Sequence, residues 1–254
     1  DRTAVCCLSS LNLEYFDEWK DHPLFIKDLV TMLDNVLETF IDNIVNLKGV
    51  NNKIESYTEF LDYVKVDKEG YAKAAYSAYR ERAVGLGAMG FHSFLQRNSI
   101  SFEGIYATSF NNRCFKYIKE QADETSRTLA SVRGEAPDMD GSGRRNACLL
   151  AVAPNASSSI ICGGTSPSIE PIRANIYTHK TLTGSYKVKN KYLEKLLEEK
   201  GINTKETWQE IAANEGSVQT LKELSEEEKE IFKTAPEINQ IWIIEHAVQR
   251  QKYV

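Results

Sequence analysis

Apolar side chains recur every third or fourth residue between Asp21 and Leu47, which is the spacing of an amphipathic helix with one buried face. We expect Asp21 to cap the start of this helix and Gly49 to stop it. The apolar stripe consists of Leu29, Leu33, Val36, Leu37, Phe40, Ile41 and Ile44. A second helix is expected from about residue 110 to residue 132, before Gly134 and Pro137.

Three other segments have strand patterns. In residues 3–13 the side chains of Val5, Cys7 and Ser9 point to one side, and those of Ala4, Cys6 and Leu8 to the other. Residues 84–98 are expected to form a short strand that turns into a helix, and the apolar run 146–154 is typical of a buried strand. Strands that alternate with helices predict an α/β fold with some parallel sheet.

The last quarter of the chain is charged and helical in pattern. We expect Asn203 to cap the start of one helix, with Glu206 as its partner, and Ser225 to cap another in a capping box with Glu228. The expected division is therefore a strand-and-helix portion over residues 1–190 and a helical portion over 191–254.

Composition limits the function. The 254 residues carry 31 Lys and Arg against 36 Asp and Glu, a net charge of -5 that argues against a general nucleic-acid coat. No apolar run is long enough for a membrane span, and the first residues lack a signal-peptide pattern. Five irregularly spaced cysteines favour a reducing, cytoplasmic location.

Both ends look cut from something longer, because the chain starts inside a strand pattern without Met and closes on a helical pattern without a stop.

The segment APNASSSIICGGTSPSIEP, residues 153–171, is small and nearly neutral. Its strand pattern stops at Pro154, and the residues that follow offer free amides at a helix start together with hydroxyl donors. Asn155, Ser157 and Ser158 are therefore candidate phosphate ligands. An ordinary N-cap and tight turn, in which TSPS is only a turn, is the alternative.

This segment and its continuation resemble the substrate-diphosphate loop of the large subunit of class I ribonucleotide reductase. The match rests on PNASS, on SIEP at 168–171 and on NIYT at 175–178, in that order. AVCCLSSLNL resembles the strand that carries a redox-active cysteine of that family, and RAVGLGAMGFHSF resembles its glycine-rich strand and helix. The resemblance implies half of a ten-stranded α/β barrel with a mostly helical C-terminal part.

The same resemblance implies roles for individual residues. Asn155, Ala156, Ser157 and Ser158 would hold the diphosphate of a ribonucleoside diphosphate, with the backbone role of Asn155 more secure than its side-chain role. Cys6 would be the reducing cysteine, with a disulfide partner outside this chain. A bridge between Cys6 and Cys7 would strain the backbone, and Cys7 is expected to pack on the opposite face.

Cofactors and partners also follow from the resemblance. No metal is expected in this chain, and no pair among its histidines and cysteines has metal-ligand spacing. A di-metal radical cofactor is expected in a separate small subunit, with thioredoxin or glutaredoxin as reductant. An oligomer is expected, with no nucleic acid and no membrane as partner.

The radical-cysteine loop of the family, Asn-x-Cys-x-Glu, is not found. The most similar segment is Asn146–Leu150, in which Leu150 stands where the family has the carboxylate. Cys148 is interpreted as a core residue. The tyrosine pair, the C-terminal Cys-x-x-Cys and the N-terminal nucleotide-binding cone are not found either. We therefore expect the chain to need a complementing N-terminal half and to be inactive alone.

Two other functions compete with this interpretation. One is a phosphate- or nucleotide-binding α/β module without redox activity, and Gly85, Gly87 and Gly90 do form a literal G-x-G-x-x-G. The preceding residues YSAYRERA read as helix, which favours structural glycines. The other is DNA binding by residues 207–224, whose pattern mimics a helix-turn-helix around Gly216; the acidic surroundings favour an ordinary helical hairpin.

Overall fold

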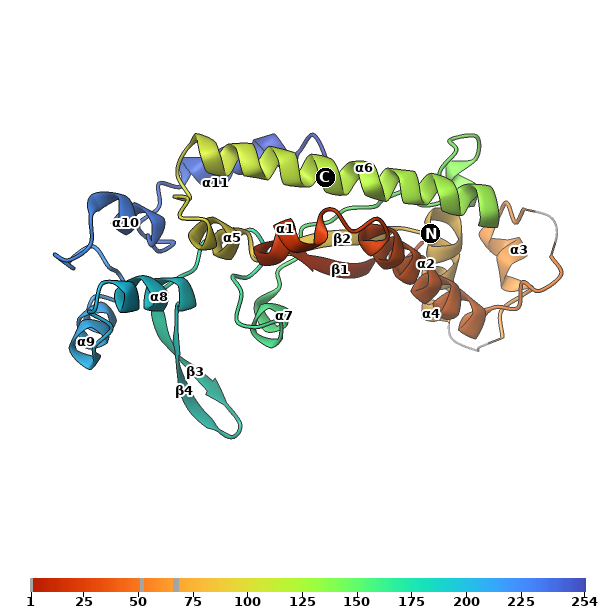
Figure 1. The fold of residues 1–254 in the computed structure, drawn as a ribbon. Coiled ribbons are helices and arrows are strands. Elements are labelled where there is room, and N and C mark those ends of the chain that lie inside the picture. Colours follow the sequence, from red (N-terminus) through yellow and green to blue (C-terminus); the bar gives the residue numbers. More distant parts are fainter. Residues whose placement is uncertain (1, 51–52, 66–68) are drawn as a thin grey trace.

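A computed structural model describes residues 2–50, 53–65 and 69–254, and Figure 1 shows their arrangement. Two parallel strands lie at its centre, β1 (Cys7–Asn12) and β2 (Val84–Met89), paired from Cys7 opposite Val84 to Asn12 opposite Met89. Residues 148–151 follow the other edge of β2, where the amide of Leu86 donates to the carbonyl of Leu149 at 2.8 Å. The predicted strand over 146–154 is thus only a strand-like path, with one bridge between Leu86 and Leu150.

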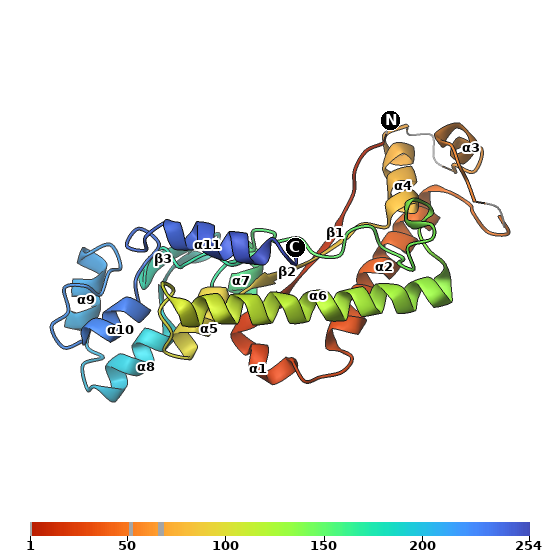
Figure 2. The same ribbon diagram turned by 90° about the horizontal axis from the view of Figure 1, so that it is seen from above.

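Helices cover one face of these strands. The long helices α2 (Phe25–Ile44) and α6 (Ile105–Arg133) pack on each other, and Figures 1 and 2 show α6 running along most of the molecule. The main hydrophobic core lies between these helices and the strands and includes Leu11, Leu37, Leu86, Phe110 and Phe115. The shorter elements on this side are η1 (Leu13–Tyr15), α1 (Phe16–Trp19), α3 (Tyr57–Leu61), α4 (Glu69–Glu81), α5 (Phe91–Arg97) and η2 (Pro137–Met139).

The C-terminal part begins with an antiparallel hairpin, β3 (Ile176–Thr181) and β4 (Gly184–Lys189), which follows the short helix α7 (Ala156–Ile161). Four helices complete it: α8 (Lys191–Glu199), α9 (Lys205–Ala213), α10 (Glu226–Ile231) and α11 (Ile241–Arg250). A second hydrophobic cluster around Leu193, Trp208 and Phe232 holds α8, α9 and α10 together, whereas α11 returns to α6.

The mixed helix and strand content confirms the α/β class. The described residues contain no closed barrel, because their strands form one parallel pair and one hairpin. Within those residues, no helix has the length and apolar composition that crossing a membrane requires.

Two predicted helix ends are wrong at α2. The helix begins at Phe25 after Leu24, not after Asp21. The reason is Pro23, because a residue that precedes proline, here His22, avoids the helical conformation. The helix ends before Val45, four residues short of Gly49. By contrast, the predicted stop of α6 at Gly134 is confirmed, with a positive φ of 85°.

The caps in the C-terminal part gave mixed results. Ser225 and Glu228 form the predicted capping box at the start of α10. At α9 the cap is Thr204, whose side chain accepts a bond from the amide of Thr207 at 3.2 Å, so the prediction of Asn203 is wrong by one residue. Asn203 instead accepts a bond from the indole Nε1 of Trp208 at 2.6 Å.

The helical hairpin predicted for residues 207–224 is also wrong. Helix α9 ends at Ala213, and residues 214–225 form turns. Gly216 lies against the chain before β3, where an added Cβ would be 2.4 Å from the Cβ of Ala174. With no second helix at this place, the segment has no helix-turn-helix.

Candidate functional site

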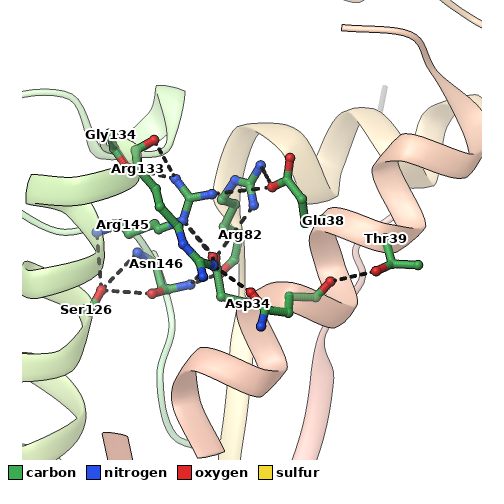
Figure 3. A network of polar contacts seen from close by, with 10 residues as sticks. Asp34, Glu38, Thr39, Arg82, Ser126, Arg133, Gly134, Arg145 and Asn146 are labelled. Carbon is green, nitrogen blue, oxygen red and sulfur yellow. Dashed lines mark hydrogen bonds and ion pairs between the residues drawn. The ribbon is translucent and has the colours of Figure 1, made fainter. Parts of the chain in front are cut away.

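The amino ends of the central strands are closed by a buried ion-pair network (Figure 3). Asp34 on α2 is fully buried and accepts bonds from Nε of Arg145 at 2.8 and 2.9 Å and from Nη1 of Arg133 at 2.8 Å. Arg82, just before β2, lies 3.6 Å from Asp34 and pairs with Glu38 at 2.5 Å. Burial favours a raised pKa for Asp34, but Arg145, Arg82 and Arg133 together outweigh it and hold the pKa below its usual value.

A cavity of about 660 Å³ opens beside this network. Its basic groups all have acidic partners: Lys53 pairs with Asp140 at 2.9 Å, and the three arginines pair with Asp34 or Glu38. The network therefore ties α2, α6 and the strand starts together and leaves no cation there without a partner among the described residues.

The carboxyl ends of the same strands carry the candidate phosphate segment. With its amide nitrogen facing the strands, Asn155 donates to the carbonyl of Ala88 at 3.1 Å and of Ala153 at 2.9 Å, and contacts Oγ of Ser10 at 3.0 to 3.1 Å. The Asn155 side chain therefore joins the segment to β1 and β2 and makes no cap bond to α7. The strands therefore fix the position of the Asn155 side chain, and the Asn155 backbone leads into α7.

Ala156, Ser157 and Ser158 form the first turn of α7 and are exposed. Their amides have no acceptor among the described residues, as expected for the first turn of a helix. Ser159 differs, because it is buried and its hydroxyl donates to the carbonyl of Ala156 at 3.1 Å. Three amides and two hydroxyls without a partner in the described part of the chain thus lie together at the strand ends and can donate hydrogen bonds to an anion.

The segment then returns to β2 and is fixed there. Ser166 and Ser93 exchange two bonds, at 2.8 and 3.0 Å, between the amide of each and the hydroxyl of the other. Gly90, at the end of β2, donates to the carbonyl of Ser166 at 2.8 Å and adopts a positive φ of 78°. The residues TSPS are mostly buried in these contacts, which supports the interpretation of a structural turn.

The second sequence candidate, Cys6, lies on the open face of the strand pair. Cys6 and Leu8 are exposed, whereas Cys7 packs against the core as predicted. Partial burial raises the pKa of the Cys6 thiol, and Cys148 and Cys7 add to the effect. The thiol is therefore protonated at neutral pH.

On this face of the strands, glycines leave no room for a side chain. A Cβ at Gly85 would be 3.1 Å from Sγ of Cys6 and 2.8 Å from the Cβ of Ala151, and one at Gly87 would be 2.4 Å from the carbonyl O of Ala151. Gly85 and Gly87 lie inside β2 and not in a turn after it, so the context required for a dinucleotide fingerprint is missing. The structural interpretation of the three glycines is supported.

The structure thus places Cys6 and Asn155 on one side of the same strand pair. Cys6 precedes β1, and Asn155 reaches Ser10 near its other end. Four residues separate Cys6 from Ser10, which corresponds to about 13 Å along a strand.

Cys148 corrects one prediction. It is exposed, not a core residue. An apolar run predicts burial where both faces of a sheet are covered, but the described helices cover only one face here. The sequence alone gave no sign that Cys148 would influence Cys6.

Sequence reasoning also missed Glu14, which is buried after β1. Its carboxylate bonds to Lys191 and Tyr192 at the start of α8, and its carbonyl accepts from Arg97 at 3.0 Å. Burial acts to raise the pKa of Glu14, but the bonds from Lys191 and Tyr192 keep it below its usual value. A signal was present, since Glu14 is the one acidic residue within the apolar stretch LNLEYF.

His92 is bonded to the chain directly after the candidate phosphate segment. This imidazole is completely buried on α5, and its Nδ1 accepts a bond from the amide of Ile172 at 3.0 Å. Burial lowers the pKa of His92 to about 3, so the ring is neutral at physiological pH and can accept this bond.

Comparisons with known proteins agree with the resemblance. A sequence model described as "Ribonucleotide reductase, barrel domain" matches residues 1–144 and 137–254. The ribonucleoside-diphosphate reductase large subunits of Invertebrate iridescent viruses 6 and 3 are 48% and 44% identical to the chain and are matched over all of it. The solved structure of the Actinobacillus ureae class Id ribonucleotide reductase alpha subunit superposes on the whole chain with a TM-score of 0.86 and 42% identity. The chain spans only 24%, 37% and 43% of these three proteins, respectively.

Proposed function

The chain belongs to the ribonucleotide reductase barrel-domain family, and from this premise we propose that it is the part of a class I large subunit that binds the substrate diphosphate and supplies one reducing thiol. The substrate would be a ribonucleoside diphosphate and the product the corresponding deoxyribonucleoside diphosphate. The observation that carries the proposal is the open amide and hydroxyl cluster of Ala156, Ser157 and Ser158 on the side of the strands that holds Cys6.

Diphosphate binding would use backbone dipoles in place of a lysine. The amides of Ala156, Ser157 and Ser158 have no acceptor among the described residues, and the two hydroxyls are exposed. Amides at a helix start favour anions through both hydrogen bonds and the helix dipole. Asn155 would contribute through its position, since its side chain already bonds to the strand ends.

The reduction itself would replace the ribose 2′ hydroxyl by hydrogen and release water. Two thiols each lose one hydrogen and form one disulfide, so two electrons and two protons reach the substrate and its leaving hydroxyl. Cys6 would be one of these thiols, and its raised pKa keeps the hydrogen on sulfur until it is needed. The second thiol would come from outside this chain, as the resemblance implies, and a Cys6–Cys7 bridge suits disulfide geometry poorly.

The remaining parts of the machinery are proposed on the family resemblance. The two parallel strands and the strand-like path would belong to half of a ten-stranded barrel, completed by an N-terminal half that carries the radical cysteine. A separate small subunit would supply the radical from a di-metal cofactor, and thioredoxin or glutaredoxin would reduce the disulfide after each cycle. The isolated chain would bind substrate without converting it.

Substrate binding can be tested on the 254-residue chain itself. We expect calorimetry to show that ADP binds and that AMP binds more weakly. Ser157→Ala and Ser158→Ala should each weaken ADP binding about tenfold, the value of one hydrogen bond to a charged group. Neither variant should change the unfolding midpoint in urea, since both side chains are exposed.

The matched control is Ser185→Ala on β4, an equally exposed serine away from the segment. Its ADP affinity should equal that of the wild type. An ADP affinity in the double variant Ser157→Ala/Ser158→Ala equal to that of the wild type would contradict the assignment of the segment.

The redox role is tested in the reconstituted complex with a limiting amount of substrate. One thiol of Cys6 should be oxidised for each product formed, measured by alkylation and mass spectrometry. Cys6→Ser should abolish multiple turnover, whereas Cys162→Ser, which changes another exposed cysteine, should leave it intact. Product formed with Cys6 still reduced would leave only the competing function, a nucleotide-binding module without redox activity.

A further inference from the structure

Glu14 is a buried carboxylate directly after β1, and the proposed reaction gives it no role. Its side chain is fully buried and accepts bonds from the ammonium of Lys191 and the hydroxyl of Tyr192, both at the start of α8. Its backbone amide donates to Oδ1 of Asn12 at 3.1 Å. A buried charge needs partners of this kind, and Glu14 has them within the described part of the chain.

Three polar groups meet where Gly90 has no side chain. A Cβ at Gly90 would lie 2.5 Å from Oδ1 of Asn12, 2.6 Å from Oγ1 of Thr165 and 3.0 Å from the amide nitrogen of Glu14. The hydroxyl of Thr165 donates to Oδ1 of Asn12 at 3.4 Å. Burial acts to raise the pKa of Glu14, and the hydroxyl of Thr165 is one of the groups that lower it. Thr165 is therefore attached to both polar residues at the end of β1.

Thr165 is also the residue at which the candidate phosphate segment returns from α7. Its amide donates to the carbonyl of Ser159 at 3.1 Å, and the amide of Ser159 donates to the carbonyl of Asn155 at 2.9 Å. The end of the segment is thus bonded back to the first turn of α7, which carries the open amides. A displacement of Thr165 would be passed on to that turn.

Helix α7 depends on attachments of this kind because it has only six residues. So short a helix is not stable by its own hydrogen bonds, and its orientation is set by what it is tied to. Asn155 ties its start to Ser10 and Ala88. Thr165 ties the chain that follows it to Asn12 and Glu14, and Glu14 in turn is held by α8.

We propose that Glu14 is a positioning residue for the substrate diphosphate, which acts through Thr165 on the orientation of α7. This inference rests on the proposed function, since it takes the open amides of residues 156–158 as the diphosphate ligands. Glu14 does not touch the diphosphate. Without its charge, Lys191 and Tyr192 are released from the strand end and Thr165 is held less firmly. The diphosphate must then order the amides as it binds, which lowers its affinity.

The first measurement is the ADP affinity of the 254-residue chain by calorimetry. Glu14→Gln should bind ADP about fivefold more weakly than the wild type, at the lower end of the usual coupling between separated sites. The matched control is Glu194→Gln, which removes the carboxylate bonded to Lys189 at 2.8 Å and lies on the same helix α8. Its ADP affinity should equal that of the wild type.

A double-variant cycle separates positioning from a general loss of structure. Thr165→Val removes the hydroxyl through which Glu14 acts and keeps a side chain of the same shape. In this background Glu14→Gln should cause no further loss of ADP affinity, because the shared contact is already gone. A role of Glu14 in overall packing predicts two independent losses that add, and that result would overturn the proposal.

Hydrogen exchange tests the same link without a ligand. The amides of Cys162, Gly164 and Thr165 bond to carbonyls within the segment. In Glu14→Gln they should exchange about fivefold faster than in the wild type, as expected for a locally loosened unit. The amides of α2 serve as the reference and should exchange at an unchanged rate. A general loss of stability would accelerate both sets and would count against the proposal.

If Glu14→Gln fails to fold, Tyr192→Phe serves instead, because it removes only one bond to the carboxylate. It should change ADP affinity and segment exchange in the same direction. Wild-type ADP affinity and exchange in whichever of these variants folds would overturn the proposal and leave the proposed function standing. If the wild type itself binds no ADP, the proposed function fails and the inference fails with it.

Discussion

At the amino ends of β1 and β2 the charged side chains are paired with one another around Asp34, whereas at the carboxyl ends the amides of Ala156, Ser157 and Ser158 have no protein partner among the described residues. The first region is built from long side chains that close on a buried carboxylate. The second is built from small side chains held in place by Asn155, Ser166 and Gly90.

The difference separates stability from binding. Ligands of parallel α/β sheets bind beyond the carboxyl ends of the strands, where loops leave backbone groups open. The opposite ends have no such task, so their polar groups can be used entirely within the protein. Substitutions at the amino ends should therefore cost folding free energy, and those at the exposed tip of the carboxyl ends should cost affinity.

The largest effect is expected for Asp34→Asn. Removing the buried charge leaves Arg82, Arg133 and Arg145 close together without it, and breaking a buried ion pair costs about 3–5 kcal/mol. Urea denaturation should show this loss in the free energy of unfolding. The matched control is Glu38→Gln, which changes a half-exposed partner of the same arginines and should cost less than about 1 kcal/mol.

The same carboxylate has a pH signature. The pKa of Asp34 is lower in the folded chain than in the unfolded one, so its contribution is complete above about pH 4 and is lost as the pH falls through the folded value. Asp34→Asn should lack this part of the acid transition. An equal loss of stability in Asp34→Asn and Glu38→Gln would remove the contrast between the two ends.

A smaller effect is expected for Gly90→Ala at the carboxyl ends. The new Cβ would lie 2.5 Å from Oδ1 of Asn12 and 2.6 Å from Oγ1 of Thr165, in addition to the strain of a positive φ. Together these should cost about 3 kcal/mol. Gly49→Ala has a similar positive φ in open space and should cost only about 1–2 kcal/mol.

Gly90→Ala should also weaken ADP binding, because the methyl group pushes on the segment that returns from α7. Gly49→Ala should bind ADP as the wild type does. Equal unfolding free energies for the two variants would show that the strand end is not closely packed.

The smallest effect concerns His92 and mild acid. Its pKa is about 3 in the folded chain against about 6.5 when unfolded, so stability is complete above pH 6.5 and falls as the pH decreases from there. Between pH 6.5 and pH 5 the loss should reach about 2 kcal/mol. His246 adds to it in the same direction, since its pKa is lowered to about 4.

The measurement is the free energy of unfolding in urea at both pH values. His92→Gln should remove the part of this loss that comes from His92, about 2 kcal/mol, and leave the part that comes from His246. A slope that is the same in His92→Gln as in the wild type would place the acid sensitivity elsewhere.

Local patterns predicted what local chemistry decides. The capping box of Ser225 and Glu228, the stop of α6 at Gly134 and the alternation that separates Cys6 from Cys7 are all confirmed, because each depends on neighbouring residues. The family resemblance rested on such short motifs, and the matched family agrees with it.

Errors arose where distant residues decide. Asn203 is a good cap by type, but Trp208 takes its side chain and Thr204 caps α9 instead. The turn at Gly216 follows from its contact with the chain near Ala174, which no pattern within residues 207–224 contains. The roles of Cys6 and of Asn155 to Ser158 stay predictions. Their placement beside the same strand pair could not have been predicted from the sequence, because Cys6 and Asn155 lie about 150 residues apart.

The side chain of Asn155 has one more consequence, since it spans from Ser10 on one strand to Ala88 on the other. A slip of one residue between those strands would displace the anchor points by about 3.3 Å and turn alternate side chains over. The position of the first turn of α7 therefore depends on the register between β1 and β2. Selection for faithful ligand placement would act on that alignment as strongly as on the groups that touch the ligand.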